Sequence, residues 1–301
     1  MPNSLVHFGV QGLIGRTLFP QVDVRWILLG CLIPDVPWIV QRILRAIFPF
    51  LDLYDLRLYA IVQASFFECL ILCSVCCVLS SAPRQVFFIL SLNSIIHLLV
   101  DALQIKWANG VHLFAPFSWN LMNVGWFWPE SIVTYVLTIF GLGWVVWVMW
   151  KVWPTTTLFK KPSPGSLAWA FGLLMVYMIS PIYFLQGPWL ADNHFVQTIQ
   201  NIDYREGKPI EFDRISYSKG LDQDQILTWA DEAIVVAGLR SPQSGTVSIR
   251  GHFENSKTVN IHQIHEHSWW FRDGASLLGL SLFFVIWIIP IFTKSTMLAK
   301  K

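Results

Sequence analysis

Between Glu130 and Lys151 the chain reads SIVTYVLTIFGLGWVVWVMW (131–150), a run of 20 residues without a charge. A helix rises about 1.5 Å per residue, so roughly 20 apolar residues cross the ~30 Å hydrocarbon core of a bilayer. Residues 166–185 and 274–293 have the same length and character. These three segments predict membrane-spanning helices.

The composition as a whole also indicates a lipid environment. Of the 301 residues, 54% are hydrophobic and 13% are charged, whereas soluble domains carry about 25% charged residues. The formal net charge of +2 is too small to indicate a nucleic acid partner, and we expect none. Membrane lipid is therefore the first partner that the sequence predicts.

The N-terminal half contains further apolar segments of less regular form. Residues 58–83 carry Glu68 as their single charge and predict one span, and residues 85–100 predict another. Residues 26–40 contain Pro34-Asp35-Val36-Pro37, so their helix is expected to break or end there. Residues 5–19 are short for a full crossing. Together with the three long spans, these four segments predict a multi-pass helical membrane protein of about seven segments.

Basic residues predict the orientation, because lysine and arginine are enriched in cytoplasmic loops. The residues that mark inner loops and an inner C-terminus are Arg16, Arg25, Arg84, Lys151, Lys160, Lys161, Lys294, Lys300 and Lys301. The N-terminus, residues 104–129 and the polar region 190–272 are then expected outside. The exceptions, which this topology places outside, are Arg42, Arg45, Arg57 and Lys106.

The region 190–272 has a polar, alternating pattern. Residues 246–253 and 259–264 flank a turn at 254–257 and predict a β-hairpin. Residues 196–204 and 209–217, around a turn at 205–208, predict a second hairpin. We expect residues 222–232 to be helix-like and residues 233–239 to form a fifth strand. This pattern predicts a small β-rich module, an OB-like barrel of about five strands.

The sequence therefore divides into three parts. Residues 1–186 are expected to form a helical membrane domain, and residues 187–272 an inserted, extracytoplasmic, barrel-like soluble domain. Residues 273–301 then form a final transmembrane helix with a cytoplasmic tail.

Asn93, His97 and Asp101 lie four residues apart, so on a helix they form one polar stripe. A neutral imidazole and a carboxylate on adjacent turns can ligate one divalent metal ion. Ionisable side chains cost ~2.5 kcal/mol or more near the centre of a span and usually line a cavity or pathway. Hydrogen bonding between two helices is the simpler interpretation. Both interpretations stay open on these residues alone.

Three further residues are expected near the same outer face. Asp35 follows a proline that ends a helix, and His7 lies in the first apolar segment. Gly110 permits a tight turn that would bring His112 back over the stripe. Asp35 could instead be an ordinary helix-terminal acid, and His7 an interfacial side chain. Because the topology rests on lysines and arginines alone, this agreement supports a site independently.

The order of these motifs resembles a known family. The motifs are His7, Gly30-Cys31-Leu32-Ile33-Pro34-Asp35, His97-Leu98-Leu99-Val100-Asp101 and Gly110-Val111-His112-Leu113-Phe114-Ala115-Pro116-Phe117. Over residues 1–125 this pattern resembles the membrane-bound, LexA-regulated metal-dependent hydrolases of the YdjM type. Nothing in that pattern accounts for the region 190–272.

The resemblance implies a bacterial inner-membrane protein that binds a divalent metal ion. We expect zinc first, with ligands among the residues His7, Asp35, His97, Asp101 and His112. Two positions depart from the family. Pro37 stands where members often have a second acid, and Gln63 stands nearest to a family histidine. These departures would leave one metal ion instead of two, or an inactive site.

The leading hypothesis is a metal-dependent hydrolase at the outer face, acting on a lipid-linked or phosphate-containing substrate. The metal would lower the pKa of a bound water, and Asp35 is the candidate base that takes its proton. The alternative is a non-catalytic membrane anchor that displays the β-rich domain to a protein or glycan partner. A proton pathway or transporter is a third interpretation, although no inverted repeat is visible.

A second group of histidines lies at residues 262–267. On a strand, His265 and His267 share one face while His262 points the other way. We interpret this tract as a strand edge near the membrane surface, with a second metal site as the alternative. Asp192 and His194 receive no role from the sequence.

Overall fold

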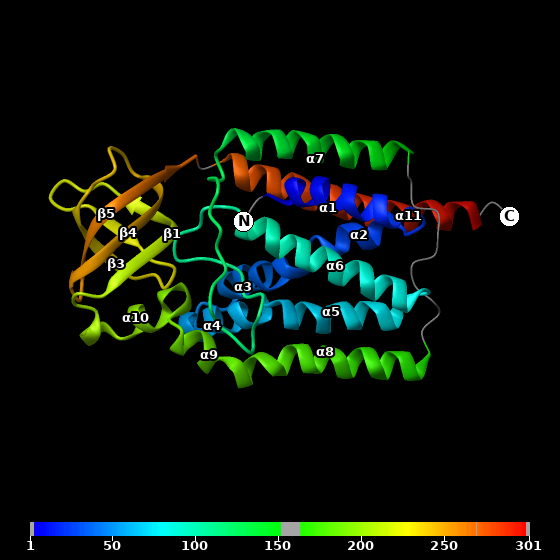
Figure 1. The fold of residues 1–301 in the computed structure, drawn as a ribbon, viewed down its shortest axis with the longest axis horizontal. Coiled ribbons are helices and arrows are strands. Elements are labelled where there is room, and N and C mark those ends of the chain that lie inside the picture. Colours follow the sequence, from blue (N-terminus) through cyan, green and yellow to red (C-terminus); the bar gives the residue numbers. More distant parts are fainter. Residues whose placement is uncertain (1–2, 152–162, 269, 299–301) are drawn as a thin grey trace.

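The computed structural model describes residues 3–151, 163–268 and 270–298. It has two parts, a bundle of helices and a small β-barrel docked at one end of the bundle (Figure 1). The helices of the bundle are α1 (Ser4–Leu18), α2 (Val24–Gly30), α3 (Val36–Ile47), α4 (Leu53–Gln63), α5 (Phe66–Leu79), α6 (Pro83–Ala102), α7 (Ile132–Lys151), α8 (Pro164–Phe184) and α11 (Phe271–Leu298).

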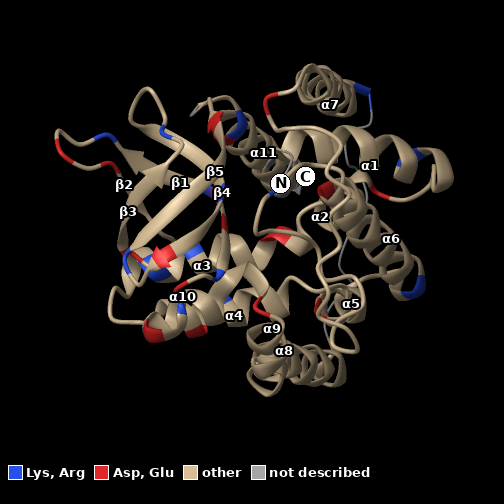
Figure 2. Ribbon diagram, turned by 60° about the vertical axis from the view of Figure 1, so that its left-hand side comes forward, with Lys and Arg blue, Asp and Glu red and all other residues tan. Residues whose placement is uncertain are grey.

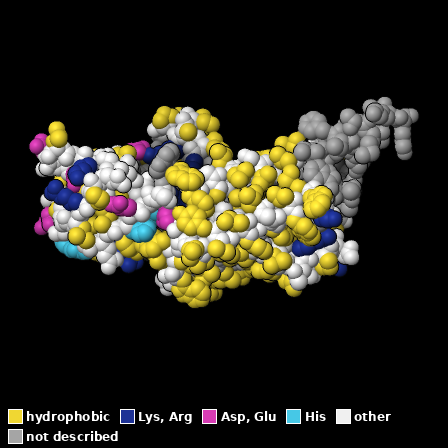
Figure 3. All heavy atoms as spheres, turned by 90° about the horizontal axis from the view of Figure 1, so that it is seen from above, with side chains coloured by type: hydrophobic (Ala, Val, Ile, Leu, Met, Phe, Trp, Pro, Cys, Tyr) yellow, Lys and Arg dark blue, Asp and Glu magenta, His cyan; other side chains and the backbone are white. Residues whose placement is uncertain are grey.

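Five helical segments of the described chain are long and apolar enough to cross a membrane. They are Val24–Ile47, Pro83–Ala102, Ile132–Lys151, Pro164–Leu190 and Phe271–Ile288. The sides of these helices carry exposed apolar residues, with Ile132 78% and Trp169 70% exposed (Figure 3). Water disfavours apolar surface of this extent, whereas lipid does not. The structure thus agrees with the predicted multi-pass helical part.

One predicted span is wrong in its form. Residues 58–83 do not make a single helix, because α4 and α5 meet at a bend of 69°. Ser65 causes the break, since it leaves the helical conformation and its Oγ accepts a hydrogen bond from the backbone N–H of Glu68. Such a bent pair is either a broken span or a re-entrant loop, and counted as one span it brings the number of candidate spans in the described chain to six. Residues 5–19, the remaining predicted segment, form the 15-residue α1.

Two glycines allow the helices around α1 and α2 to approach closely. A Cβ atom on Gly141 of α7 would lie 1.8 Å from the backbone oxygen of Leu5 in α1. A Cβ atom on Gly30 of α2 would lie 2.7 Å from Cβ of Asn93 in α6. Small residues let helix backbones pack in this way. These contacts set the first turns of α1 against α7 and the end of α2 against α6.

Charged side chains are distributed unevenly over the molecule. They gather on the barrel, in loops and at helix ends, and the bundle surface is mostly apolar (Figures 2 and 3). α6 begins and α7 ends at the end of the bundle far from the barrel, so Arg84 and Lys151 lie there (Figure 1). The N-terminus lies at the barrel end (Figure 1).

The β-rich domain is a closed barrel of five strands, as predicted. Its strands are β1 (Pro209–Ser218), β2 (Gln225–Leu227), β3 (Ala233–Gly238), β4 (Gly245–Asn255) and β5 (Thr258–His267), and they pair in the order β1-β2-β3-β5-β4. β3 and β5 are parallel, and the other pairs are antiparallel. The predicted hairpin at 246–264 corresponds to β4 and β5, which pair across the turn.

Two local predictions in this domain are wrong. Residues 196–204, predicted as a strand, form helix α10 (Val196–Gln200) and a 3-10 turn at Ile202–Tyr204. Val196 and Ile199 are buried on one side at helical spacing. Residues 222–232, expected to be helix-like, contain the short strand β2. Pairing with β1 and β3 on both sides decides its conformation.

Arg205, which the sequence predicts to lie in a turn, is fully buried. Its guanidinium donates to both carboxylate oxygens of Glu232 at 2.6 Å. It also donates to the backbone oxygens of Ile199 and Ser256 and lies over the ring of Phe253. One side chain thus links α10, the loop before β3 and the β4–β5 turn.

Substitution of Arg205 by Met is expected to destabilise the barrel by about 3 kcal/mol or more, because it leaves the carboxylate of Glu232 without its partner. Denaturant unfolding of the full chain, followed by a fluorescence probe on the barrel, measures the change. Lys208→Met is the matched control, since Lys208 is exposed in the same turn and should cost about 0.5 kcal/mol or less. Equal losses in the two variants would contradict the structural role of Arg205.

Candidate metal centre

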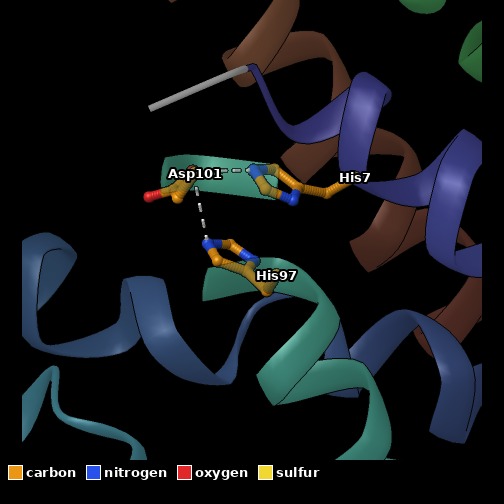
Figure 4. Close-up of side chains that lie close together, drawn as sticks. All are labelled: His7, His97 and Asp101. Atoms are coloured by element: carbon orange, nitrogen blue, oxygen red, sulfur yellow. Dashed lines mark ion pairs between the residues drawn. The ribbon is translucent and has the colours of Figure 1, made fainter. Parts of the chain in front are cut away.

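Four of the five predicted ligands converge at the barrel end of the bundle. His7 lies in the first turns of α1, His97 and Asp101 lie on successive turns of α6, and Asp35 ends the 3-10 turn Ile33–Asp35. Nε2 of His7 is 3.3 Å from Oδ1 of Asp101. Nε2 of His97 is 3.5 Å from Oδ1 of Asp35 and 4.0 Å from Oδ1 of Asp101. Figure 4 shows His7, His97 and Asp101 pointing toward one another.

The facing atoms of this group are buried and unsatisfied. Nε2 of both histidines and Oδ1 of both aspartates have no hydrogen-bond partner among the described residues. The two imidazole rings stack in parallel with centroids 3.7 Å apart. An unpartnered buried polar atom costs about 1–3 kcal/mol. His7, His97 and Asp101 offer ligand-type atoms within 4.8 Å of one another, and Asp35 adjoins them through His97, an arrangement that suits a cation.

The distances fit a small divalent cation. Tetrahedral zinc holds nitrogen and oxygen ligands at about 2.0–2.1 Å, which puts neighbouring ligand atoms roughly 3.3–3.4 Å apart. For the group His7, His97 and Asp101, the 3.3 Å separation matches that spacing, and the 4.0 Å separation needs a shift of a few tenths of an ångström. Imidazole nitrogen and carboxylate oxygen are donors that zinc accepts. The residues present therefore fit the expected metal ion.

A second layer of contacts orients the two histidines. Nδ1 of His97 donates to the backbone oxygen of Cys31 at 2.7 Å, so Nε2 is left with its lone pair facing the group. Nδ1 of His7 lies 2.9 Å from the carboxamide of Gln11, one turn further along α1. A carboxamide rotated by about 180° presents its oxygen instead of its nitrogen. With that rotation Gln11 accepts from Nδ1, and Nε2 of His7 faces the group as a lone pair.

Lys106 fixes the remaining oxygen of Asp101. Its Nζ donates to Oδ2 at 2.9 Å, and both side chains are buried. Asp101 therefore carries one oxygen paired with a cation and one oxygen directed at the histidines. The sequence did not single out Lys106 for this role, although its spacing of five residues from Asp101 at the helix end carries the signal.

His112 does not join this group. Its Nε2 accepts a hydrogen bond from Nδ2 of Asn193 at 2.9 Å, and its ring lies over that of His194 at 6.3 Å. Burial lowers the pKa of His112 to about 4, which keeps the ring neutral as this hydrogen bond requires. The turn at Gly110 does bring His112 back to the bundle, but against the segment before α10 rather than over the His97–Asp101 stripe. Gln63, at the family histidine position, binds the backbone oxygen of Tyr177 in α8.

A cavity of about 400 Å³ lies beside Asp101 and Lys106 and is also lined by His112 and His194. Residues 211–216 of β1 close it from the barrel side. Ligand sites commonly have volumes of about 300–1,000 Å³. The barrel thus forms one wall of the cavity beside the candidate metal centre. No local sequence pattern predicts this contact, because its two sides lie about a hundred residues apart in the chain.

The histidines of β5 lie at another contact between the barrel and the bundle. His265 and His267 share one side of the strand, as predicted, and gather with Glu130 with ligand-type atoms within 4.8 Å of one another. Nδ1 of His267 lies 2.9 Å from Oε1 of Glu130, and the ring of His265 stacks on that of Trp128. Arg214 also donates to Glu130. His262 points away and pairs with His252 on the exposed side.

Comparisons with protein-family models, with curated proteins and with solved structures find no match to this chain.

Gln11→Leu is expected to weaken zinc binding by roughly 10–100-fold, because it removes the group that orients His7. Titration of the purified protein against a zinc-chelating indicator measures the dissociation constant. Gln63→Leu is the control, since Gln63 is equally buried but faces α8. Unchanged affinity in Gln11→Leu would show that this contact does not support the histidine.

Glu130→Gln is expected to lower the melting temperature at pH 7, with a difference that shrinks as the pH falls. Burial alone would raise the pKa of Glu130, but its contacts with His265, His267 and Arg214 hold this pKa well below its usual range. The stabilisation is therefore complete above the unfolded value of about 4.3 and is lost as the pH falls below it. Thermal unfolding at pH 7, 5, 4 and 3 tests this, with exposed Glu206→Gln as control. A pH-independent difference would contradict the charge-based account.

Proposed function

We propose that this chain is a membrane-bound, metal-dependent hydrolase. The observation that carries the proposal is the convergence of four buried ligand atoms without a hydrogen bond, from His7, Asp35, His97 and Asp101, beside a cavity of about 400 Å³. Their contacts with one another, at 3.3 Å, 3.5 Å and 4.0 Å, are longer than the hydrogen bonds expected in a purely structural polar cluster. The resemblance of residues 1–125 to the YdjM-type hydrolases supports the same reading.

The residues divide between holding the ion and moving a proton. His7, His97 and Asp101 would hold the cation, and a divalent ion there supplies a Lewis acid and lowers the pKa of water. Asp35 is the most exposed of the four side chains, at 16%, so it can reach a water that enters from the cavity. Its carboxylate would take the proton as general base. Lys106 neutralises the second oxygen of Asp101 and keeps that side chain in place.

We place the site at the outer face of a bacterial inner membrane, with the N-terminus and the barrel outside and the C-terminus inside. The basic residues Arg84 and Lys151 support this, because they lie at the end of the bundle opposite the barrel. The site then lies where a substrate can arrive from the outer leaflet.

The barrel is proposed to be OB-like and to serve the site as a wall. Its strand order β1-β2-β3-β5-β4 with one parallel pair, β3–β5, supports an OB-like arrangement. The backbone N–H of Ala108 donates to Glu211 at 2.7 Å, and Asn109 contacts Asp213, so β1 is fixed to the loop after α6. A domain that served only for display would not need to line this cavity. That contact favours the hydrolase over the non-catalytic anchor.

His97→Ala is expected to lose both bound zinc and hydrolysis, whereas Asp35→Asn retains zinc and loses hydrolysis by at least about 100-fold. Metal analysis gives the first readout. Turnover of p-nitrophenyl phosphate, bis(p-nitrophenyl) phosphate and p-nitrophenyl acetate gives the second. His262→Ala is the control, since His262 lies on the exposed side of the barrel. No zinc in the native protein, and no change in these variants, would overturn the proposal.

A further inference from the structure

The cavity beside the candidate metal centre carries an excess of positive charge. Of its lining side chains, six are cationic and three are anionic. The cations are Arg42, Arg45, Arg57, Lys106, Arg214 and Arg272, and the anions are Asp101, Glu211 and Asp213. An excess of this kind raises the local concentration of anionic ligands.

Two of the three acids form ion pairs. Asp101 binds Lys106 at 2.9 Å, and Glu211 binds Arg250 at 2.8 Å. Asp213 accepts a hydrogen bond from the hydroxyl of Ser248 at 2.9 Å and keeps its charge, which attracts Arg57 without an ion pair. Three arginines of the lining have carboxylate partners outside it, namely Asp231 for Arg45, Glu130 for Arg214 and Asp273 for Arg272. Among the described lining residues, Arg42 and Arg57 are thus the cations without an ion pair.

Arg57 of α4 is the cation that stands out. Its Cζ atom lies over the rings of Trp38 and Trp229, 5.1 Å and 5.3 Å from their centroids. No carboxylate of the described chain forms an ion pair with it, and its Nε is buried without a hydrogen-bond partner. The two indole rings stabilise the positive charge, and the N–H groups of the guanidinium remain the part that can bind an anion.

His194 supplies a second donor beside Arg57. Nη2 of Arg57 donates a hydrogen bond to Nδ1 of His194 at 2.8 Å, so the neutral ring carries its proton on Nε2. That Nε2 is buried, and it has no hydrogen-bond partner within the described ranges. His194 is held at a φ of 57°, a left-handed conformation that costs about 1–3 kcal/mol in a residue other than glycine. Arg57 and His194 are therefore neighbouring residues of the cavity lining, each with an unsatisfied N–H donor of the kind that phosphate oxygens accept.

A second cavity, of about 300 Å³, adjoins the first and has an apolar side. Trp38, Arg42 and Arg272 line both cavities. The second one also contains Asp35 together with Ile39 of α3 and the α11 residues Leu277 and Leu280. It runs between two helices whose outer sides carry exposed apolar residues, so it offers a path from lipid to the site.

We propose that Arg57 and His194 bind the phosphate of a phosphate-bearing amphiphile whose hydrocarbon part lies between α3 and α11. The phosphate then lies in the cavity beside Asp101, and the apolar part leaves past Leu277 and Leu280. As a substrate assignment this rests on the proposed hydrolase, whereas phosphate binding by Arg57 stands on its own geometry. A soluble phosphate ester shares the same headgroup chemistry and differs by leaving the second cavity empty.

Calorimetric titration of the detergent-purified full chain with inorganic phosphate tests the anion site. Arg57→Gln is expected to weaken phosphate binding at least about tenfold. Arg57→Lys is expected to weaken it less, because lysine keeps the charge but loses the paired N–H donors of the guanidinium. Arg45→Gln is the matched control. Arg45 lines the same cavity but is paired with Asp231, so its loss should change binding less than about threefold.

A bulky residue in the second cavity tests the hydrocarbon part. Ser276→Trp is expected to weaken binding of dihexanoyl phosphatidic acid at least about fivefold and to leave inorganic phosphate unaffected. Thermal unfolding of each variant shows whether it remains folded. If both ligands bind Ser276→Trp as they bind the native protein, the ligand is a soluble phosphate ester and the lipid assignment is wrong.

The anion site would be overturned if Arg57→Gln and Arg57→Lys bound phosphate as tightly as the native protein does. It would also be overturned if the native protein bound no phosphate. Zinc content, measured on the same samples, separates this result from the fate of the hydrolase. Lost phosphate binding with retained zinc in Arg57→Gln supports both proposals. Absent zinc in every sample, with phosphate binding still dependent on Arg57, overturns the hydrolase and leaves the anion site standing.

Discussion

Asp101 is a carboxylate buried in a helical bundle, and its two oxygens require different partners. One oxygen is paired with Lys106, whose backbone begins the loop that crosses to the barrel. The other faces His7 and His97, which come from α1 and α6. A buried carboxylate without compensation is strongly unfavourable. The position of α1 and the course of the loop after α6 meet this requirement, and the same loop holds β1 of the barrel through Ala108.

The close packing of the bundle makes this arrangement possible. His7 lies on α1, which packs tightly on α7 at Gly141 and brings the His7 ring against that of His97. Cys31 reaches His97 because α2 packs tightly on α6 at Gly30. The break at Pro34 then turns the chain so that Asp35 faces the same point. Sequence positions that look like ordinary helix features thus set the geometry of the candidate metal centre.

Much of this organisation follows from local sequence patterns. Length and hydrophobicity predict the long helices, and a spacing of four residues predicts that His97 and Asp101 share a face. Alternation predicts β4 and β5. The topology alone places His7 and Asp35 near that face, because residues at the end of a span must lie near one membrane surface.

The remaining features depend on contacts between distant parts of the chain. β2 takes its conformation from two neighbours, and the break at Ser65 replaces one long helix by two. His112 turns to Asn193, and Arg57 turns to His194, a pairing that spans 137 positions. Single-sequence periodicity carries no information about such pairs. The cavity that they line therefore emerges only from the folded chain.

The most direct test of this account is an anomalous-difference map from zinc-loaded crystals, recorded on both sides of the zinc edge. The account predicts one strong peak about 2.0–2.2 Å from Nε2 of His7, Nε2 of His97 and Oδ1 of Asp101. No peak at that point, or a peak confined to Glu130, His265 and His267, would contradict it.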